Sequence, residues 1–162
     1  MPHWQTLFKF ALAAESNARD LINDAEILLA AKRWPRAYAL AVLAHEVLGK
    51  ALMAQALVAA PPSAITPERL HELTGGHARR LTSTYQHEAM VGGSSWEAEL
   101  ARSPELARSA NERKQRGFYV DLGDGESLRL PSEIGEDEAR AQVTSVKETV
   151  CSTGLRSMPF WL

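Results

Sequence analysis

The chain has 162 residues, 45% of them hydrophobic, which predicts one domain with a single sizeable core (residues 1–162). A formal net charge of -2 and a pI near 6.2 exclude a strongly basic nucleic-acid-binding protein. The single cysteine, Cys151, excludes an internal disulfide, and we expect a reducing, cytoplasmic location. The N-terminal segment lacks the basic start and clean apolar stretch of a secretory signal.

The first predicted helix covers about seven turns. Its apolar stripe, at alternating spacings of four and three, contains Trp4, Phe8, Ala11, Ala18, Ile22, Ala25 and Leu29. Glu15 falls on the same stripe, and we expect its stem to lean out to water. Trp34 and Pro35 end this helix, and Pro35 suits the first turn of the next.

The second predicted helix is almost free of charge. Between Arg36 and Glu68 the only charged residues are Glu46 and Lys50, with His45 beside them. Ala37–Ala60 is long enough to cross a membrane, but two charges near its midpoint and many alanines argue against a span. We therefore expect the central helix of a bundle and no membrane contact.

Turn residues divide the rest of the chain. Thr66-Pro67-Glu68 begins a third helix that Gly75-Gly76 kinks or breaks, and a fourth, which Pro104 could interrupt, covers Trp96–Arg116. A short hairpin is expected from Phe118–Asp121 and Ser127–Leu130 around Gly123-Asp124-Gly125. A last helix begins at Pro131-Ser132 and ends near Gly154. The predicted fold is an all-α bundle of four to five helices with this hairpin before the last helix.

Three groups of residues could carry chemistry. Glu46 and Lys50 lie one helical turn apart and could form either an internal ion pair or part of a site, whereas His45 points about 100° away from Glu46. Arg80 and His87 share a helix face with His77 at its edge, and histidine with arginine is the minimum set for metal-independent RNA cleavage. The third group either contacts phosphate and a base or simply solvates a helix end; it contains Asn111, Arg113, Lys114, Arg116, Tyr119 and Asp121.

Metal and cofactor sites find little support in the sequence. Glu68 and His71 have the Glu-x-x-His spacing of di-iron bundles, but that site needs a second copy, which is absent from the sequence. A cysteine zinc site, a glycine-rich phosphate loop and a Gly-x-Ser-x-Gly elbow are absent too. We expect no metal and no cofactor.

Four segments in order resemble the AbiV family of abortive-infection proteins, which is assigned to the HEPN superfamily. These segments are Arg36–Lys50, Gly76–Leu81, Lys114–Asp121 and Pro131–Ala139. The resemblance covers most of the chain. It implies a helical bundle that dimerises, and many HEPN proteins are metal-independent endoribonucleases with toxin or antiphage roles.

The resemblance also assigns candidate residues. The family's acidic-Glu-x-x-Gly-Lys signature falls on Glu46, Gly49 and Lys50, with His45 where the family is often acidic. Its histidine-plus-basic motif falls on His77 and Arg80, and its Gly-aromatic-Tyr-Val-Asp motif falls on 117–121. The superfamily's catalytic signature, Arg and then His after four to six residues, fits Arg80 with His87.

The resemblance therefore implies a homodimeric phage-defence protein that cleaves RNA or blocks translation. Arg80, His87, His77 and Glu46 are then the catalytic candidates, and the substrate-binding candidates are Lys50, Arg113, Lys114, Arg116, Tyr119 and Asp121. The alternative is a non-catalytic dimeric module that binds a phage protein or a ribonucleoprotein. A purely structural helical dimer is the third possibility.

Overall fold

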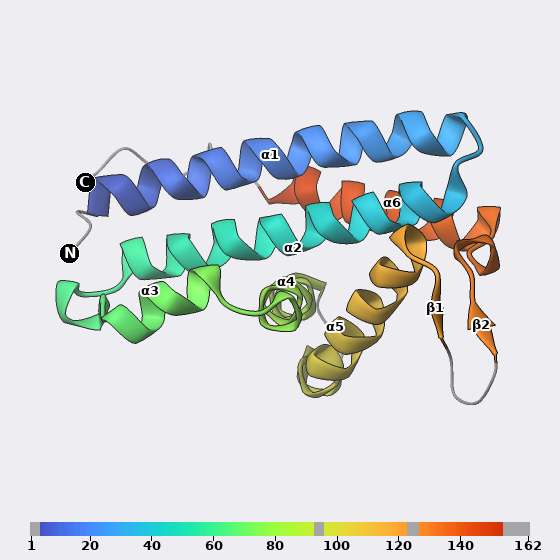
Figure 1. The fold of residues 1–162 in the computed structure, drawn as a ribbon. Coiled ribbons are helices and arrows are strands. Elements are labelled where there is room, and N and C mark those ends of the chain that lie inside the picture. The colour runs from blue at the N-terminus through green and yellow to red at the C-terminus, as the bar shows by residue number, and fades with distance from the viewer. Residues whose placement is uncertain (1–3, 93–95, 123–126, 154–162) are drawn as a thin grey trace.

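The computed structural model describes residues 4–92, 96–122 and 127–153. Figure 1 shows that helices dominate this part of the chain. The helices are α1 (Trp4–Ala30), α2 (Trp34–Ala59), α3 (Pro67–Thr74), α4 (His77–Gly92), α5 (Trp96–Phe118) and α6 (Glu136–Ser152). Two short 3-10 turns are η1 (Pro62–Ala64) and η2 (Pro131–Glu133), and two short strands are β1 (Asp121–Leu122) and β2 (Leu128–Arg129). The all-α class with a hairpin before the last helix is confirmed.

Small side chains bring α1 and α2 close together. The two helices run side by side along their length, with α6 packed against both (Figure 1). Buried alanines recur every seven residues on each helix, at Ala11, Ala18 and Ala25 and at Ala37, Ala44 and Ala51. Because alanine has only a methyl side chain, an alanine at every second turn lets the two backbones approach closely. Valines of α6 complete this core.

The turn between α1 and α2 has a helix-capping geometry. The Arg33 N–H donates to the Leu28 carbonyl at 2.8 Å and the Lys32 N–H to the Leu29 carbonyl at 3.0 Å. Lys32 has a φ of 58°, the left-handed conformation that this Schellman arrangement requires. Pro35 then sits in the first turn of α2, as the sequence predicts.

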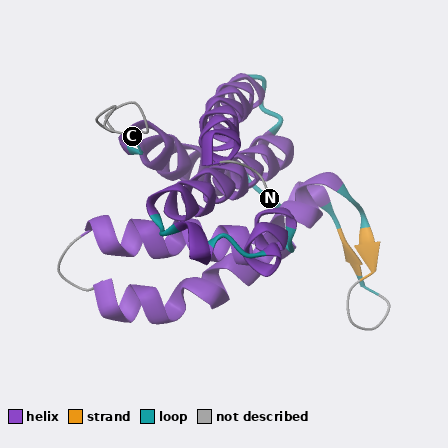
Figure 2. Cartoon of the chain, turned by 90° about the vertical axis from the view of Figure 1, so that its left-hand side faces the viewer, coloured by secondary structure: helices purple, strands orange, loops and turns teal. Residues whose placement is uncertain are grey.

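Helix α2 is the central helix, because α1, α4, α5 and α6 all contact it. It is long and apolar enough for a membrane span, but 61% of that stretch is buried inside the protein. Helices α4 and α5 form an antiparallel pair (Figure 2), and α4 crosses α2 steeply, since it is seen nearly end-on in Figure 1. A second apolar cluster lies at this crossing, around Tyr38, Val42 and Leu81.

Several local predictions are resolved by the structure. The prediction that Glu15 leans out to water is wrong. Its side chain is buried, because α1 is closely packed at this position, and it accepts a hydrogen bond from Arg19 at 2.7 Å. Gly75-Gly76 breaks the chain into α3 and α4 instead of kinking one helix. Pro104 lies inside α5 without interrupting it.

The hairpin is shorter than predicted. Phe118 ends α5 and belongs to no strand, and β1 pairs antiparallel with β2 in the register Asp121–Arg129 and Leu122–Leu128. The strands project away from the bundle (Figures 1 and 2). The expected turn residues 123–125 and the expected helix end at Gly154 lie outside the described residues.

Gly49 sets the distance between α2 and α4. A methyl group built on it would lie 2.1 Å from the Arg80 carbonyl oxygen and 2.9 Å from the Thr84 hydroxyl. Both α4 atoms would have to move, and one of them is backbone. Close approach of α4 at this point therefore requires glycine.

Gly49→Ala should lower the free energy of unfolding. Alanine in a helix gains up to about 1 kcal/mol over glycine, but overpacking costs about 1–3 kcal/mol or more, and here the loss should prevail because backbone must shift. Urea unfolding measures the difference. The control is Gly76→Ala, where nothing lies within 4 Å of the added methyl group; equal stability losses in the two variants would contradict the packing argument.

Candidate functional site

The Glu46 carboxylate lies at the crossing of α2, α4 and α5 and contacts three side chains. Its Oε1 lies 2.7 Å from Nδ1 of His77 and 3.0 Å from Nη1 of Arg80, both on α4. Its Oε2 accepts a hydrogen bond from Nζ of Lys114, on α5, at 2.8 Å. Glu46 itself is 1% exposed. One buried carboxylate therefore holds three groups from two other helices.

Local structure explains how these groups reach Glu46. His77 and Arg80 are three residues apart in the first turn of α4 and so lie on neighbouring positions of one face. Nη2 of Arg80 also donates to the Gly75 carbonyl at 2.5 Å, which ties the guanidinium to the break between α3 and α4. Lys114 continues the buried stripe of small residues on α5, which contains Ser103, Ala107, Ala110 and Gly117.

The surroundings of Glu46 favour its charged form. Burial alone would raise the pKa of Glu46, but the hydrogen bond and charge of Lys114, the hydrogen bond from His77 and the charge of Arg80 outweigh burial and lower it. Glu46 is therefore a carboxylate at neutral pH. Removing one partner of such a buried pair leaves an uncompensated charge.

The ionised Glu46 fixes the protonation of the His77 ring. A carboxylate can only accept, so the 2.7 Å contact requires His77 Nδ1 to carry the proton. In neutral His77 the lone pair is then on Nε2. The His77 side chain is 53% exposed, so this arrangement presents a basic nitrogen near solvent. A carboxylate that orients a histidine in this way is a common element of acid–base sites.

Lys50 is close to this group but does not pair with Glu46. Within the described part of the chain, no ion pair joins the two residues, so the self-contained pair considered from the sequence does not form. Lys50 is half-buried. Burial and then the charge of Arg80 lower the pKa of Lys50, against an opposing effect of Glu46.

His45 belongs to a second polar cluster. Its Nε2 lies 3.0 Å from Oε1 of Glu88, which also accepts a hydrogen bond from Thr149 of α6 at 2.5 Å. The His45 ring packs edge-on against Tyr85, with centroids 4.7 Å apart. The prediction that His45 and Glu46 point in different directions is confirmed. Two Glu–His contacts therefore join α2 to α4: α2 supplies the glutamate in Glu46–His77 and the histidine in His45–Glu88.

Thr84 connects the two clusters. Its hydroxyl lies 2.9 Å from the His45 carbonyl oxygen and 3.1 Å from the Arg80 carbonyl oxygen, and it is fully buried. The hydroxyl can donate to either carbonyl, one in each helix. Thr84 therefore helps to fix the position of Arg80 along α2.

The other predicted residues lie outside the Glu46 cluster. His87 is half-buried and influences Glu88 through its charge; it sits two turns, or about 10 Å, along α4 from Arg80. Arg113 makes an ion pair with Glu138 of α6. Arg116 is half-buried, and Tyr119 and Asp121 are exposed where the chain leaves α5 for the hairpin.

Some site residues had no usable signal in the sequence. Glu88 and Thr149 come from different helices, and nothing in their spacing indicates that they share His45. Lys114 did have a signal, because it falls on the 4-3 stripe of small residues on α5 and not on that helix's exposed face. The sequence prediction places Lys114 in one group with Arg113 and Arg116, whereas the structure buries Lys114 against Glu46.

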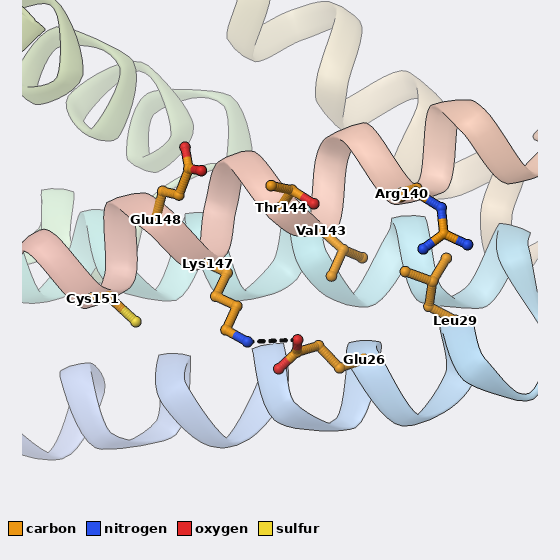
Figure 3. Close-up of a pocket in the computed structure, with 8 residues that line it drawn as sticks. All are labelled: Glu26, Leu29, Arg140, Val143, Thr144, Lys147, Glu148 and Cys151. Carbon is orange, nitrogen blue, oxygen red and sulfur yellow. Dashed lines mark hydrogen bonds and ion pairs between the residues drawn. The ribbon is translucent and has the colours of Figure 1, made fainter.

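Other possible sites are weaker. The described residues contain no group of three or more histidine, cysteine or carboxylate side chains that could hold a metal ion. A shallow pocket of about 450 Å³ lies between α1 and α6 (Figure 3), where Lys147 and Glu26 neutralise each other at 2.7 Å. Its lining residues are Glu26, Leu29, Arg140, Val143, Thr144, Lys147, Glu148 and Cys151. This pocket shares no residue with the Glu46 cluster.

The fold and the site define a helical bundle with a carboxylate-oriented histidine and several cations at its central crossing. The family model of AbiV, in the HEPN superfamily, matches residues 6–152. The chain therefore belongs to the AbiV family, and it is an abortive-infection protein of HEPN type. No curated protein and no solved structure matches it.

The lowered pKa of Glu46 predicts loss of stability in acid. The stabilisation from its charged form is complete above the ordinary carboxyl pKa of 4.5 and is lost as the pH falls through the lower native value. Glu46→Gln should cost about 3–5 kcal/mol at pH 7, because Arg80 and Lys114 lose their buried counter-charge. It should also flatten the dependence of stability on pH below 4.5.

Urea unfolding of the wild-type protein and the variant between pH 3 and pH 7 measures both effects. Glu26→Gln is the control, because Glu26 makes a single exposed ion pair with Lys147 and should cost no more than about 1 kcal/mol. Equal losses of unfolding free energy in Glu46→Gln and Glu26→Gln would show that the buried contacts of Glu46 stabilise the protein no more than an exposed ion pair does.

Proposed function

We propose that this protein is a metal-independent endoribonuclease that acts in phage defence, with His77 as the general base. The observation that supports this most is the 2.7 Å contact between Glu46 and Nδ1 of His77, which leaves Nε2 as a proton acceptor near solvent. RNA carries its own nucleophile, the 2′-hydroxyl, so such a base suffices without a metal.

The proposed reaction is a transesterification within RNA. Nε2 of His77 takes the proton of a 2′-hydroxyl, and the 2′-oxygen attacks the adjacent phosphorus. The bond from phosphorus to the 5′-oxygen breaks, and the leaving oxygen takes a proton from water. The hydroxide left by that water takes the proton from Nε2 of His77, which restores the base, and a 2′,3′-cyclic phosphate remains. The charges of Arg80 and Lys50 stabilise the extra negative charge that builds up on the phosphate oxygens.

The test is purified protein on end-labelled RNA in EDTA. Wild-type protein should produce fragments with cyclic phosphate ends, and His77→Ala should lower the rate at least about 100-fold, because it removes the base. Arg79→Ala is the control, since this neighbour of Arg80 is 62% exposed and pairs with Glu72. Absence of wild-type cleavage, or an unchanged rate in His77→Ala, would refute the proposal, and an unchanged rate in Arg80→Ala would remove the role given to Arg80.

The same assay compares the two histidines. The superfamily signature assigns the base to His87, whereas the geometry favours His77, which contacts Glu46 directly. His87→Ala should therefore retain most of the activity. If His87→Ala abolished cleavage and His77→Ala did not, His87 would be the general base. That result would contradict the role given to Glu46.

A second candidate function is a non-catalytic module that binds a phage protein, a ribonucleoprotein or a second copy of the chain in the cytoplasm. The observation in its favour is the projecting hairpin region, where Tyr119, Val120, Leu122 and Leu128 are all more than half exposed. Exposed apolar groups that gather at one place are typical of interaction surfaces.

A plaque assay separates the two functions. If binding protects the cell, Tyr119→Ser with Leu122→Ser should abolish phage protection and His77→Ala should not; if RNA cleavage protects it, His77→Ala should abolish protection. Ile27→Ser on α1, 66% exposed and outside the hairpin, is the control. Arg113→Ala with Arg116→Ala tests the basic end of α5, although Arg113 already pairs with Glu138.

A further inference from the structure

Lys114 is the member of the Glu46 cluster that has no part in the proposed reaction. It is 3% exposed, which leaves it too buried to contact RNA as the sequence predicts. Its Nζ donates to Oε2 of Glu46 at 2.8 Å and lies 3.4 Å from Nδ1 of His77. Because Nδ1 carries the proton that faces Glu46, Lys114 cannot donate a hydrogen bond to this nitrogen. A protonated His77 would therefore place a second positive charge directly beside Lys114.

A carboxylate next to a histidine has two opposite effects on a general base. It orients the ring, but its negative charge also stabilises the imidazolium, and an imidazolium cannot accept a proton. Glu46, with Oε1 2.7 Å from Nδ1, would hold His77 in this protonated form if no cation offset its charge. A base that acts near neutral pH needs the orientation without the full charge.

Two buried cations offset the charge of Glu46. Nη1 of Arg80 lies 3.0 Å from Oε1, and Nζ of Lys114 occupies Oε2. Their side chains are 8% and 4% exposed, so solvent screens both charges weakly. One negative and two positive charges next to the His77 ring leave one positive charge in excess. Without Lys114 the three charges would reduce to a neutral pair, with the carboxylate nearest to the ring.

The other charged groups near His77 do not reverse this balance. Lys50 on α2 adds a further positive charge. Arg79 on α4 has a side chain that is 62% exposed, and it pairs with Glu72 of α3 at 2.8 Å. The contribution of α5 to the contacts of this site is Lys114.

We propose that Lys114 is a positioning residue that keeps His77 unprotonated near neutral pH, so that the ring can act as the base. Lys114 acts through Glu46, because it offsets the charge of the carboxylate and leaves the hydrogen bond to Nδ1 in place. Burial would raise the pKa of Glu46, and the hydrogen bond from Lys114 is the largest of the effects that lower it. The inference rests on the proposed function, since it takes His77 as the base, but the charge balance can be measured without RNA.

The first test is an NMR titration of the histidine rings in the full chain, with His77→Gln to identify the His77 signal. In Lys114→Met the midpoint of the His77 titration should lie about one pH unit above that of the wild-type protein, because a neighbouring positive charge is removed. An equal midpoint in the two proteins would overturn the proposal.

Two further variants separate charge from other effects. Lys114→Gln keeps a hydrogen-bond donor for Glu46 without the charge, and it should shift the midpoint as Lys114→Met does. A shift that is present in Lys114→Met and absent from Lys114→Gln would assign the effect to the lost hydrogen bond and overturn the proposal. Lys147→Met is the matched control, because it removes the same charge from an exposed lysine that pairs with Glu26. It should leave the midpoint unchanged, and an equal shift there would contradict a local effect.

The pH dependence of RNA cleavage is the second test. The acid limb of kcat/KM reports the protonation of the base in the free enzyme. In Lys114→Met this limb should move up by about one pH unit, so that kcat/KM is about tenfold lower in acid and equal to wild type in alkali. A merely structural role would lower the rate by the same factor at every pH. A direct contact between Lys114 and RNA would raise KM without moving the limb, and either result would contradict the proposal.

The two proposals fail separately. A shifted His77 titration without RNA cleavage would keep the effect of Lys114 on His77 and remove the ribonuclease. RNA cleavage with an unshifted titration would keep the ribonuclease and remove the role of Lys114.

Discussion

The rest of the site depends on one buried carboxylate. Glu46 reaches the side chains of His77, Arg80 and Lys114, and so joins the central helix α2 to both members of the α4–α5 pair. A carboxylate without these partners could not stay charged at 1% exposure. Because Glu46 stays charged, the three groups around it are held in place, and the protonation of the His77 ring is fixed.

This contact is possible only because the helices come close together. Alanines at every second turn let α1 approach α2, and Gly49 lets the backbone of α4 approach the opposite side of the same helix. Thr84 and the second Glu–His contact, His45 with Glu88, then fix α4 at this distance. The residues that hold the histidine and those that pack the bundle are therefore neighbours in α2, and substitutions at Gly49 affect both packing and site.

Much of the fold could be predicted from the sequence, because apolar periodicity and proline or glycine breaks are local signals. The uncharged run gave the central helix, and Gly75-Gly76 gave the end of α3. The site was less predictable, since its contacts join residues 31 to 68 positions apart, as Glu46 does with His77 and Lys114. Glu15 shows the same limit: its burial depends on how closely α1 is packed, which a helical stripe does not reveal.

The most direct measurement of the orientation of His77 is its tautomer, read from nitrogen NMR of the two imidazole rings at a pH where both are neutral. His77 should carry its proton on Nδ1, facing Glu46. His45 provides an internal reference, because its Nε2 faces Glu88 and should carry the proton instead. Opposite tautomers in one spectrum would support the role of Glu46 as the group that orients His77. A proton on Nε2 of His77 would contradict it, because the nitrogen near solvent would then be unable to accept a proton from RNA.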